Sequence, residues 1–189
     1  ADFKNSKKIK FIYFGVFQEY NDFETIIKAF LDMRAKNDDI ELHFVGYGPL
    51  ENLINNYSNN NGLFYWGPKT YSELSTNSII SYRSIGLIPM NDENSGLRSP
   101  VKLYEYFSLG MPVVTTDTIK FKKGVLNQKI HYFYKNKNMR SCIDVLNYFI
   151  DLSSQDWIGI KKEVEIKCNS NTWSRKMEIL KNSICNLKK

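Results

Sequence analysis

Two patterns of hydrophobic and polar positions alternate along the chain. Short apolar runs that are closed by glycine or by polar turn residues predict buried strands. Segments in which apolar residues recur at every third or fourth position predict helices with one buried face. The expected strands span residues 7–15, 40–46, 63–67, 84–90, 112–117 and 130–134. The expected helices span residues 22–36, 50–58, 71–80, 101–110, 139–152, 155–168 and 172–187.

This regular succession predicts an α/β fold in which a parallel sheet is covered by helices on both faces. The first five strands are apolar throughout instead of alternating, which is typical of strands that are buried on both sides. The sequence contains no internal repeat, no low-complexity linker and no boundary to a second domain. We therefore expect residues 1–189 to form a single doubly wound, Rossmann-like domain with a helical C-terminal segment at residues 170–187.

The composition is that of a soluble globular domain, because 42% of the 189 residues are hydrophobic, 24% are charged and the mean hydropathy is −0.41. A disordered chain, a collagen-like repeat and a bundle of membrane helices are excluded. Residues 1–11 lack the apolar centre of a secretory signal. Cys142, Cys168 and Cys185 lie far apart, and the chain has only two histidines. These features predict a reducing, cytoplasmic compartment, with neither a disulfide framework nor a zinc site.

Charge is distributed unevenly along the chain. Residues 1–119 carry 11 Lys/Arg and 14 Asp/Glu, whereas residues 120–189 carry 15 Lys/Arg and 6 Asp/Glu. The basic last third is compatible with phosphorylated ligands, with peripheral docking at the inner face of the plasma membrane, or with a plain solvated surface. No C2H2 spacing, RNA-recognition signature or helix-turn-helix pattern is present, so we expect no nucleic-acid partner.

Candidate binding residues gather after the expected strands, because ligands of open parallel sheets bind beyond the carboxyl ends of the strands. Residues 15–17, 46–49, 66–68 and 89–100 are turn-forming segments at these ends. The amides of Gly96 and Leu97 lie just before the helix expected at residues 101–110 and are placed to hold a diphosphate.

Lys102 and Glu105 lie three residues apart on that helix and therefore project from one face. A cation and a carboxylate beside a phosphate-binding loop suit a nucleotide, with the lysine on phosphate and the glutamate on ribose hydroxyls. The same spacing equally fits an ordinary intrahelical salt bridge. The Gly46–Pro49 turn is no dinucleotide-binding fingerprint, because its third glycine is missing.

Three segments in this order resemble the carboxyl-terminal half of a family 4 (group 1) glycosyltransferase. They read FVGYGPLENLI at 44–54, LFYWGPKTYSEL at 63–74 and IGLIPMNDENSGLRSPVKLYEYFSLGMPVVTTD at 85–117. The run SPVKLYEYFSLGMPVV at 99–114 is the most specific, and NTWSRKMEIL at 171–180 resembles the final helix of that family. The resemblance implies one half of a GT-B fold, in which two Rossmann-like domains face each other across a cleft. It also implies that an amino-terminal acceptor domain lies outside this chain.

The resemblance implies that this half binds a UDP- or GDP-linked sugar donor. It assigns the ribose to Glu105, the diphosphate or sugar to the loop with Gly96 and Leu97, the nucleobase to Trp66 and Gly67, and the phosphates to Gly15. The acceptor is then a sugar or a lipid-linked saccharide that is held by the other domain. The expected reaction is retaining hexosyl transfer in bacterial surface polysaccharide or glycoconjugate synthesis, without metal or other cofactor, and we expect this half alone to be inactive.

The sequence departs from the family pattern at three places. Val16 stands where the family has a phosphate-binding arginine, residues 21–22 (Asn-Asp) replace a lysine, and Leu97 replaces the first of two paired glutamates. Each lost cation removes a contact of about 1.5–3 kcal/mol. Lys102 and Arg98 flank the start of the phosphate-facing helix and are expected to compensate.

These departures leave two other hypotheses open. One is a non-catalytic GT-B partner or binding module, and the other is a different phosphosugar protein of the same fold, such as an epimerase. The second needs a catalytic acid–base pair, which we do not find. No catalytic residue is identified, since His43 and His131 are expected to be structural, and residues 92–93 (Asp-Glu) are only the nearest candidate for binding a metal.

Overall fold

The computed structural model describes residues 8–58, 61–76, 78–91, 101–117 and 129–170. Six strands form one parallel sheet in the order β3-β2-β1-β4-β5-β6. The strands are β1 (Ile9–Val16), β2 (Ile40–Tyr47), β3 (Leu63–Tyr65), β4 (Ser84–Ile88), β5 (Val113–Thr116) and β6 (His131–Tyr134). The helices are α1 (Phe23–Arg34), α2 (Glu51–Tyr57), α3 (Tyr71–Thr76), α4 (Val101–Ser108), α5 (Met139–Ile150) and α6 (Ser154–Ser170).

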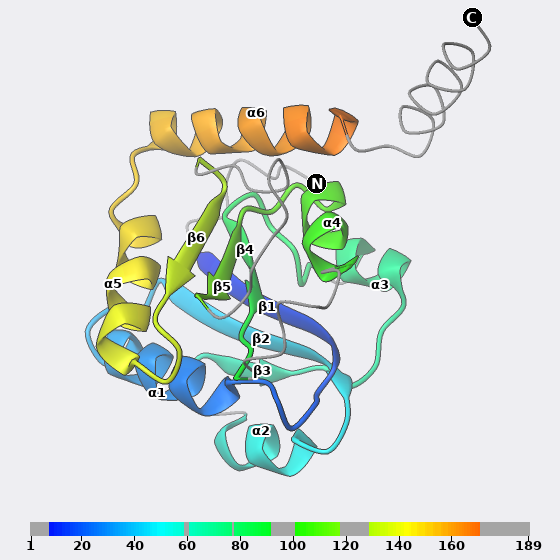
Figure 1. The fold of residues 1–189 in the computed structure, drawn as a ribbon, viewed down its shortest axis with the longest axis vertical. Helices are drawn as coiled ribbons and strands as arrows, with labels where there is room; N and C mark the ends of the chain where they lie inside the picture. Colours follow the sequence, from blue (N-terminus) through cyan, green and yellow to red (C-terminus); the bar gives the residue numbers. More distant parts are fainter. Residues whose placement is uncertain (1–7, 59–60, 77, 92–100, 118–128, 171–189) are drawn as a thin grey trace, which may run out of the picture.

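Two hydrophobic layers hold helices on the two faces of the sheet (Figure 1). The layer beneath α1 and α5 is rich in aromatic rings, among them Tyr13, Phe23 and Phe44, which pack edge to face. The opposite layer contains Ile12, Val113 and the buried residues of α3 and α4. Because both faces are covered, most strand positions are apolar and buried, although Glu41, His43 and Thr115 are buried polar exceptions. The predicted Rossmann-like α/β fold is confirmed.

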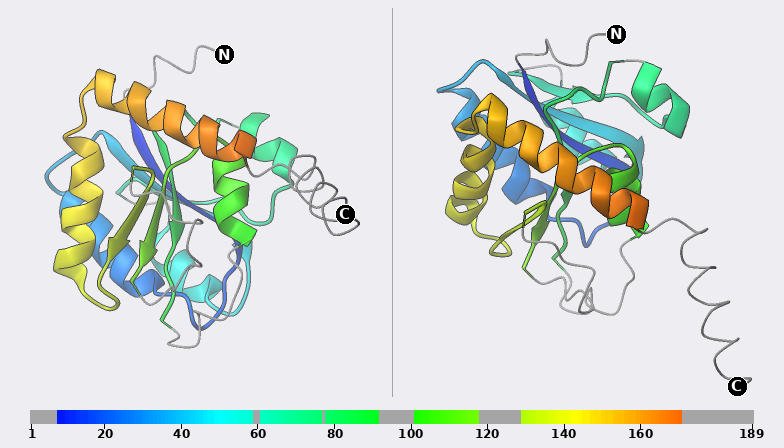
Figure 2. Two further views of the ribbon diagram at one scale, coloured as in Figure 1. Left: turned by 45° about the horizontal axis from the view of Figure 1, so that its top comes forward. Right: turned by 90° about the horizontal axis from the view of Figure 1, so that it is seen from above.

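Helix α6 lies across the side of the sheet where the strands begin (Figures 1 and 2). Its Trp157 belongs to the layer of α1 and α5, whereas Ile160 and Val164 belong to the layer of α4. The Lys161 ammonium donates a 2.6 Å hydrogen bond to the carbonyl of Gly110, in the turn after α4. Helix α6 therefore ties the two layers together at the end opposite to the carboxyl edge.

The strand order places a topological switch between β1 and β4. The whole length of β1 pairs with β2, but only residues 10–12 of β1 pair with residues 84–86 of β4. The two strands therefore separate toward their carboxyl ends. In doubly wound sheets this separation forms the crevice that receives ligands.

The structure confirms each sequence-predicted element within the described residues, with shifted ends. The largest shift is in α3, which ends at Thr76 although the pattern continues to residue 80. Ser78 has a positive φ of 55°, which cannot continue a helix, and Ile79 and Ile80 turn into the core instead. The helix expected at 172–187 and the resemblance at 171–180 lie outside the described residues.

Candidate functional site

Two glycines line the carboxyl ends of the central strands. Gly15 on β1 has a φ of 122° and Gly46 on β2 has a φ of 142°, both values that side-chain-bearing residues rarely adopt. A Cβ on Gly46 would overlap the backbone carbonyl of Gly15. Main-chain atoms therefore form the surface at the carboxyl ends of β1 and β2. The sequence predicts such glycine turns where the backbone lets a ligand approach closely.

The side chain of Lys102 crosses from α4 to the end of β1. Its ammonium donates a 2.7 Å hydrogen bond to the carbonyl of Phe14 and lies 4.7 Å from the ring centre of Tyr13. It occupies the space that a side chain on Gly15 would fill. Burial lowers the pKa of Lys102, and the negative charge of Glu105 opposes that shift.

Lys102 and Glu105 form no ion pair in the described part of the chain, so the predicted alternative of an intrahelical salt bridge is wrong. The ammonium is turned to the Phe14 carbonyl instead, and Glu105 stays half-exposed on α4. A partly buried cation thus lies at the carboxyl ends of the strands. It donates a hydrogen bond to a neutral carbonyl and contacts the rings of Tyr13 and Phe14. An anion interacts more strongly with such a cation than with an exposed lysine, because the partly buried ammonium is already largely removed from water.

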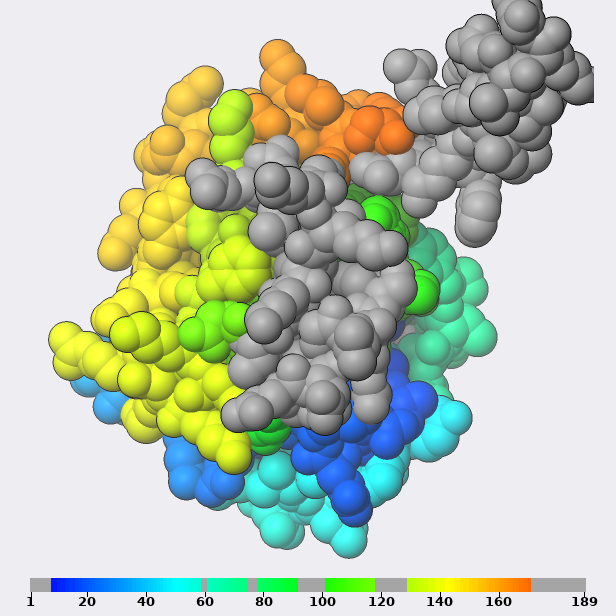
Figure 3. Space-filling view, viewed as in Figure 1, coloured from blue at the N-terminus to red at the C-terminus, as the bar shows by residue number. Residues whose placement is uncertain are grey.

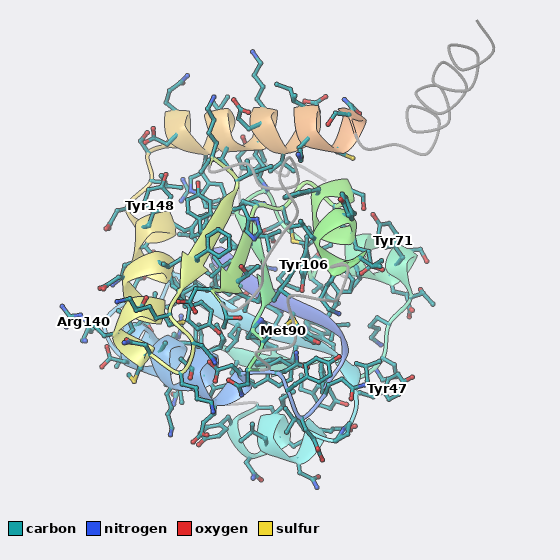
Figure 4. All side chains as sticks on the ribbon, in the orientation of Figure 1. Tyr47, Tyr71, Met90, Tyr106, Arg140 and Tyr148 are labelled. Carbon is teal, nitrogen blue, oxygen red and sulfur yellow. The ribbon has the colours of Figure 1, made fainter. Side chains whose placement is uncertain are left out.

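Tyr106 completes the contact between α4 and the switch point. Its hydroxyl donates a 2.9 Å hydrogen bond to the carbonyl of Leu87 and accepts a 3.3 Å hydrogen bond from the amide of Phe14. The ring packs edge to face on Phe14 and over Gly86, where a Cβ would overlap it. Figure 4 labels Tyr106 between α4 and the strands. Tyr106 is not among the site residues predicted from the sequence, although its position four residues after Lys102 places it on the same face of the helix.

Trp66 and Gly67 lie at the end of β3, next to Gly46. The amide of Gly46 donates a 2.9 Å hydrogen bond to the carbonyl of Gly67, which has a φ of 63° and open space where a Cβ would be. The indole N–H of Trp66 donates to Nδ1 of His43 at 3.0 Å, and Nε2 of His43 donates to a carboxylate oxygen of Glu41 at 3.0 Å. The Trp66 side chain is therefore held by the fold, and its backbone amide donates a 3.0 Å hydrogen bond to the carbonyl of Phe44 on β2.

His43 and His131 both lie in strands and are buried. Burial lowers the pKa of His43, and it lowers the pKa of His131 to about 4. Both imidazoles are therefore neutral near pH 7. Their positions agree with the structural role that the sequence predicts for them.

Two of the three departures from the family pattern lie at the end of β1 and in the turn that follows it. Val16 is 39% exposed, whereas Asn21 and Asp22 are buried. The Asn21 amide donates a 3.0 Å hydrogen bond to the carbonyl of Pro89, and a carboxylate oxygen of Asp22 accepts a 3.2 Å hydrogen bond from the backbone of Lys137. These side chains connect the loops after β1, β4 and β6, so the turn has a structural role and supplies no cation to the edge.

A cavity of about 470 Å³ opens beside this turn. In space-filling form, the segment that follows β1 (blue) reaches the surface beside α2 (cyan) (Figure 3). The cavity is lined by Glu19, Asn21, Asp22, Glu24, Thr25, Lys28, Leu50, Leu53, Asn91, Lys137 and Met139. The cavity lining therefore contains acidic side chains, basic side chains and three apolar side chains.

The structure brings four of the predicted site residues to the carboxyl ends of the strands: Gly15, Trp66, Gly67 and Lys102. Glu105 lies one turn further along α4, near enough for its charge to act on the pKa of Lys102. Gly96, Leu97 and Arg98 lie outside the described residues, as does the Asp-Glu pair at 92–93. Within the part of the chain that the structure describes, no group of three or more His, Cys, Asp or Glu side chains is arranged to hold a metal ion. None of the described helices is both long and apolar enough to span a membrane.

The family of glycosyl transferases group 1 matches the chain over residues 1–171. The chain belongs to this family. Among curated protein sequences, none matches the chain.

Solved structures share the fold at low sequence identity. The lipopolysaccharide outer core galactosyltransferase WaaB, in its apo form, has a TM-score of 0.72 and 13% identity, over 96% of this chain and 50% of WaaB. The C-terminal domain of a group 1 glycosyl transferase, LpcC from Francisella tularensis, has a TM-score of 0.63 and 17% identity, over 86% of this chain and 85% of that domain. The pneumococcal O-GlcNAc transferase GtfA, in complex with UDP and GlcNAc, has a TM-score of 0.68 and 11% identity, over 95% of this chain and 36% of GtfA. The chain thus has the fold of one half of a GT-B glycosyltransferase and spans half the length of WaaB.

Proposed function

We propose that this chain is the donor-binding half of a retaining glycosyltransferase that transfers a hexosyl group from a nucleotide-diphosphate sugar. The observation that carries the proposal is the Lys102 ammonium at the switch point, beside Gly15 and without an ion-pair partner among the described residues. A diphosphate is the part of a sugar nucleotide that such a cation recognises. The glycine-lined backbone lets the phosphates approach the sheet closely.

The remaining residues of the edge fit the other parts of a sugar nucleotide. Glu105 is half-exposed one turn from Lys102 and offers a carboxylate to the ribose hydroxyls. We assign the base to the backbone at Trp66 and Gly67, because open space surrounds the position of a Cβ on Gly67. GtfA was crystallised with UDP, so UDP is the first nucleotide to test and GDP the second. Gly96, Leu97 and Arg98 belong to the same proposed site.

In the proposed reaction, the bond between the anomeric carbon and the diphosphate breaks, and the nucleoside diphosphate leaves with the bonding electrons. The acceptor oxygen forms the new bond on the same face of the sugar, and its proton passes to the departing diphosphate. Lys102 stabilises the negative charge that develops on the diphosphate, without a metal ion or other cofactor. The acceptor, a sugar or a lipid-linked saccharide, is held by a second domain. We place the reaction in bacterial surface polysaccharide or glycoconjugate synthesis at the cytoplasmic side of the membrane, with peripheral membrane contact and without nucleic acid.

A specific observation favours a second candidate, a non-catalytic GT-B partner. Val16 and the buried Asn21 and Asp22 leave the turn after β1 without a cation for the phosphates. The complete protein, supplied with a UDP- or GDP-sugar and a saccharide acceptor, distinguishes the two candidates. Formation of a product with the anomeric configuration of the donor supports the transferase. Donor binding without turnover, in a protein that carries both domains, supports the non-catalytic partner.

A further inference from the structure

The backbone of Phe14 lies where β1 and β4 have stopped pairing. The last paired residues are Ile12 on β1 and Gly86 on β4. Two residues further along β1, the amide of Phe14 donates its hydrogen bond to the Tyr106 hydroxyl at 3.3 Å. That hydroxyl in turn donates to the carbonyl of Leu87 on β4 at 2.9 Å. A single side chain from α4 thus bridges the two strands at the point where their direct ladder ends.

Both polar groups of the Phe14 backbone are held by the same helix. The amide is bonded to Tyr106, and the carbonyl accepts the 2.7 Å hydrogen bond from the Lys102 ammonium. Lys102 and Tyr106 are four residues apart and therefore project from one face of α4. The next residue is Gly15, whose missing side chain leaves the space that the ammonium occupies.

The Tyr106 hydroxyl has no access to water that could replace these bonds, because the whole side chain is buried. Its ring fits only because residue 86 is glycine, since a Cβ there would overlap the ring. Removal of the hydroxyl leaves the partly buried Phe14 amide without this partner and the Leu87 carbonyl without a buried donor, which favours a shift of the β1 end. The carbonyl that holds Lys102 belongs to that same residue.

We propose that Tyr106 is a positioning residue of the donor site, which fixes the end of β1 so that the Phe14 carbonyl and Gly15 hold the Lys102 ammonium at the switch point. This inference rests on the proposed function, because the held ammonium is the group that meets the diphosphate. Tyr106 itself touches no donor atom. It acts through Lys102 and the Phe14–Gly15 backbone.

The test compares Tyr106→Phe with a matched control, Tyr132→Phe. Both variants keep the aromatic ring and lose one hydroxyl that donates a hydrogen bond to a backbone carbonyl. The Tyr132 hydroxyl donates to the carbonyl of Lys129, which lies before the start of β6 and therefore at the amino ends of the strands. The first readout is the NMR titration of the Lys102 side chain without ligand, assigned by its loss in Lys102→Met. In the wild type, burial lowers the pKa of Lys102. We expect Tyr106→Phe to move that pKa back toward the ordinary lysine value and Tyr132→Phe to leave it unchanged.

The second readout is the affinity for UDP and GDP, measured by calorimetry. Tyr106→Phe should weaken binding about tenfold, the equivalent of one lost hydrogen bond, and Tyr132→Phe should not weaken it. An unchanged Lys102 titration in Tyr106→Phe, or a shifted titration with unchanged nucleotide affinity, overturns the inference. If the wild type binds neither nucleotide, the proposed function fails, and the ligand-free titration still decides whether Tyr106 positions Lys102.

Discussion

The Lys102 ammonium occupies the space where a Cβ on Gly15 would lie, although 87 positions separate the two residues in the sequence. A side chain on residue 15 would displace the end of this lysine from α4. This pairing brings a partly buried cation to the point where β1 and β4 separate. The arrangement supplies a cation to the proposed donor site although Val16 stands where the family pattern has an arginine.

Substitution of Gly15 by alanine should disturb this pairing in two ways. The new methyl group overlaps the Lys102 ammonium, and the φ of 122° is strained for any residue with a side chain. We expect a loss of about 1–3 kcal/mol in the free energy of unfolding together with weaker nucleotide binding. Denaturant unfolding and calorimetry measure the two effects.

Gly159→Ala is the matched control for this variant. Gly159 lies inside α6, and open space surrounds the position of its Cβ. Alanine there should stabilise the protein by about 0.5–1 kcal/mol, because alanine favours helix more than glycine does. A Gly15→Ala variant that is as stable and binds as well as Gly159→Ala would contradict the described packing.

Removal of the Lys102 charge should weaken nucleotide binding without unfolding the protein. Lys102→Met keeps an apolar stem between the rings of Tyr13 and Phe14 but removes the charge-assisted bond to phosphate. The expected loss is about 1.5–3 kcal/mol, or roughly ten- to hundredfold in affinity. Lys36→Met, which removes an exposed lysine from an ion pair with Asp32, is the control and should bind as the wild type does. Equal affinity in both variants would show that Lys102 does not meet the donor.

Nucleotide binding should also be lost at alkaline pH, and at a lower pH than if an exposed lysine bound the phosphates. Burial lowers the pKa of Lys102, so a rise in pH removes its charge below the ordinary lysine range. Binding measured from pH 7 upward should therefore decline before pH 10.5, and the decline should be absent from the residual binding of Lys102→Met. Constant affinity of the wild type up to pH 10.5 would contradict this account.

Lys161 should make the stability of the domain depend on pH. Burial against α4 lowers its pKa to about 7 from the ordinary value of 10.5. Between these two values the unfolded chain binds a proton that the folded chain does not, so the free energy of unfolding should rise as the pH increases from about 7 to 10.5. Lys161→Met should flatten this rise, which thermal unfolding at several pH values measures. An equally steep rise in the variant would assign the effect to other groups.

Much of the fold could be predicted from local sequence because burial on both faces makes most positions of the strands apolar. Gly15, Trp66 and Gly67 could be selected because they lie at the ends of expected strands, and Lys102 and Glu105 because their spacing places them on one face of a helix. The resemblance to the family assigns the base to Trp66 and Gly67 and the phosphates to Gly15. Their grouping at one edge follows from parallel topology, in which all carboxyl ends meet on the same side.

The contacts of α4 with β1 could not be predicted in this way. Spacing alone favours Glu105 as the partner of Lys102, whereas the structure shows a bond to Phe14, which is 88 residues away in sequence. The role of Tyr106 likewise depends on Gly86, because only the folded sheet brings that glycine beneath the ring. The partner of Lys102 and the packing of Tyr106 depend on the free space at the switch point, which cannot be predicted from a local sequence pattern.

The most direct test of the central claim is calorimetric titration of the domain with UDP, GDP and their sugar conjugates, repeated with Glu105→Ala. We predict that one nucleotide binds with a dissociation constant in the micromolar to low millimolar range and that Glu105→Ala abolishes this binding. Binding that is unchanged in Glu105→Ala would contradict the assignment of α4 to the donor. The absence of binding to every nucleotide, by both this domain and the complete protein, would contradict the donor site itself.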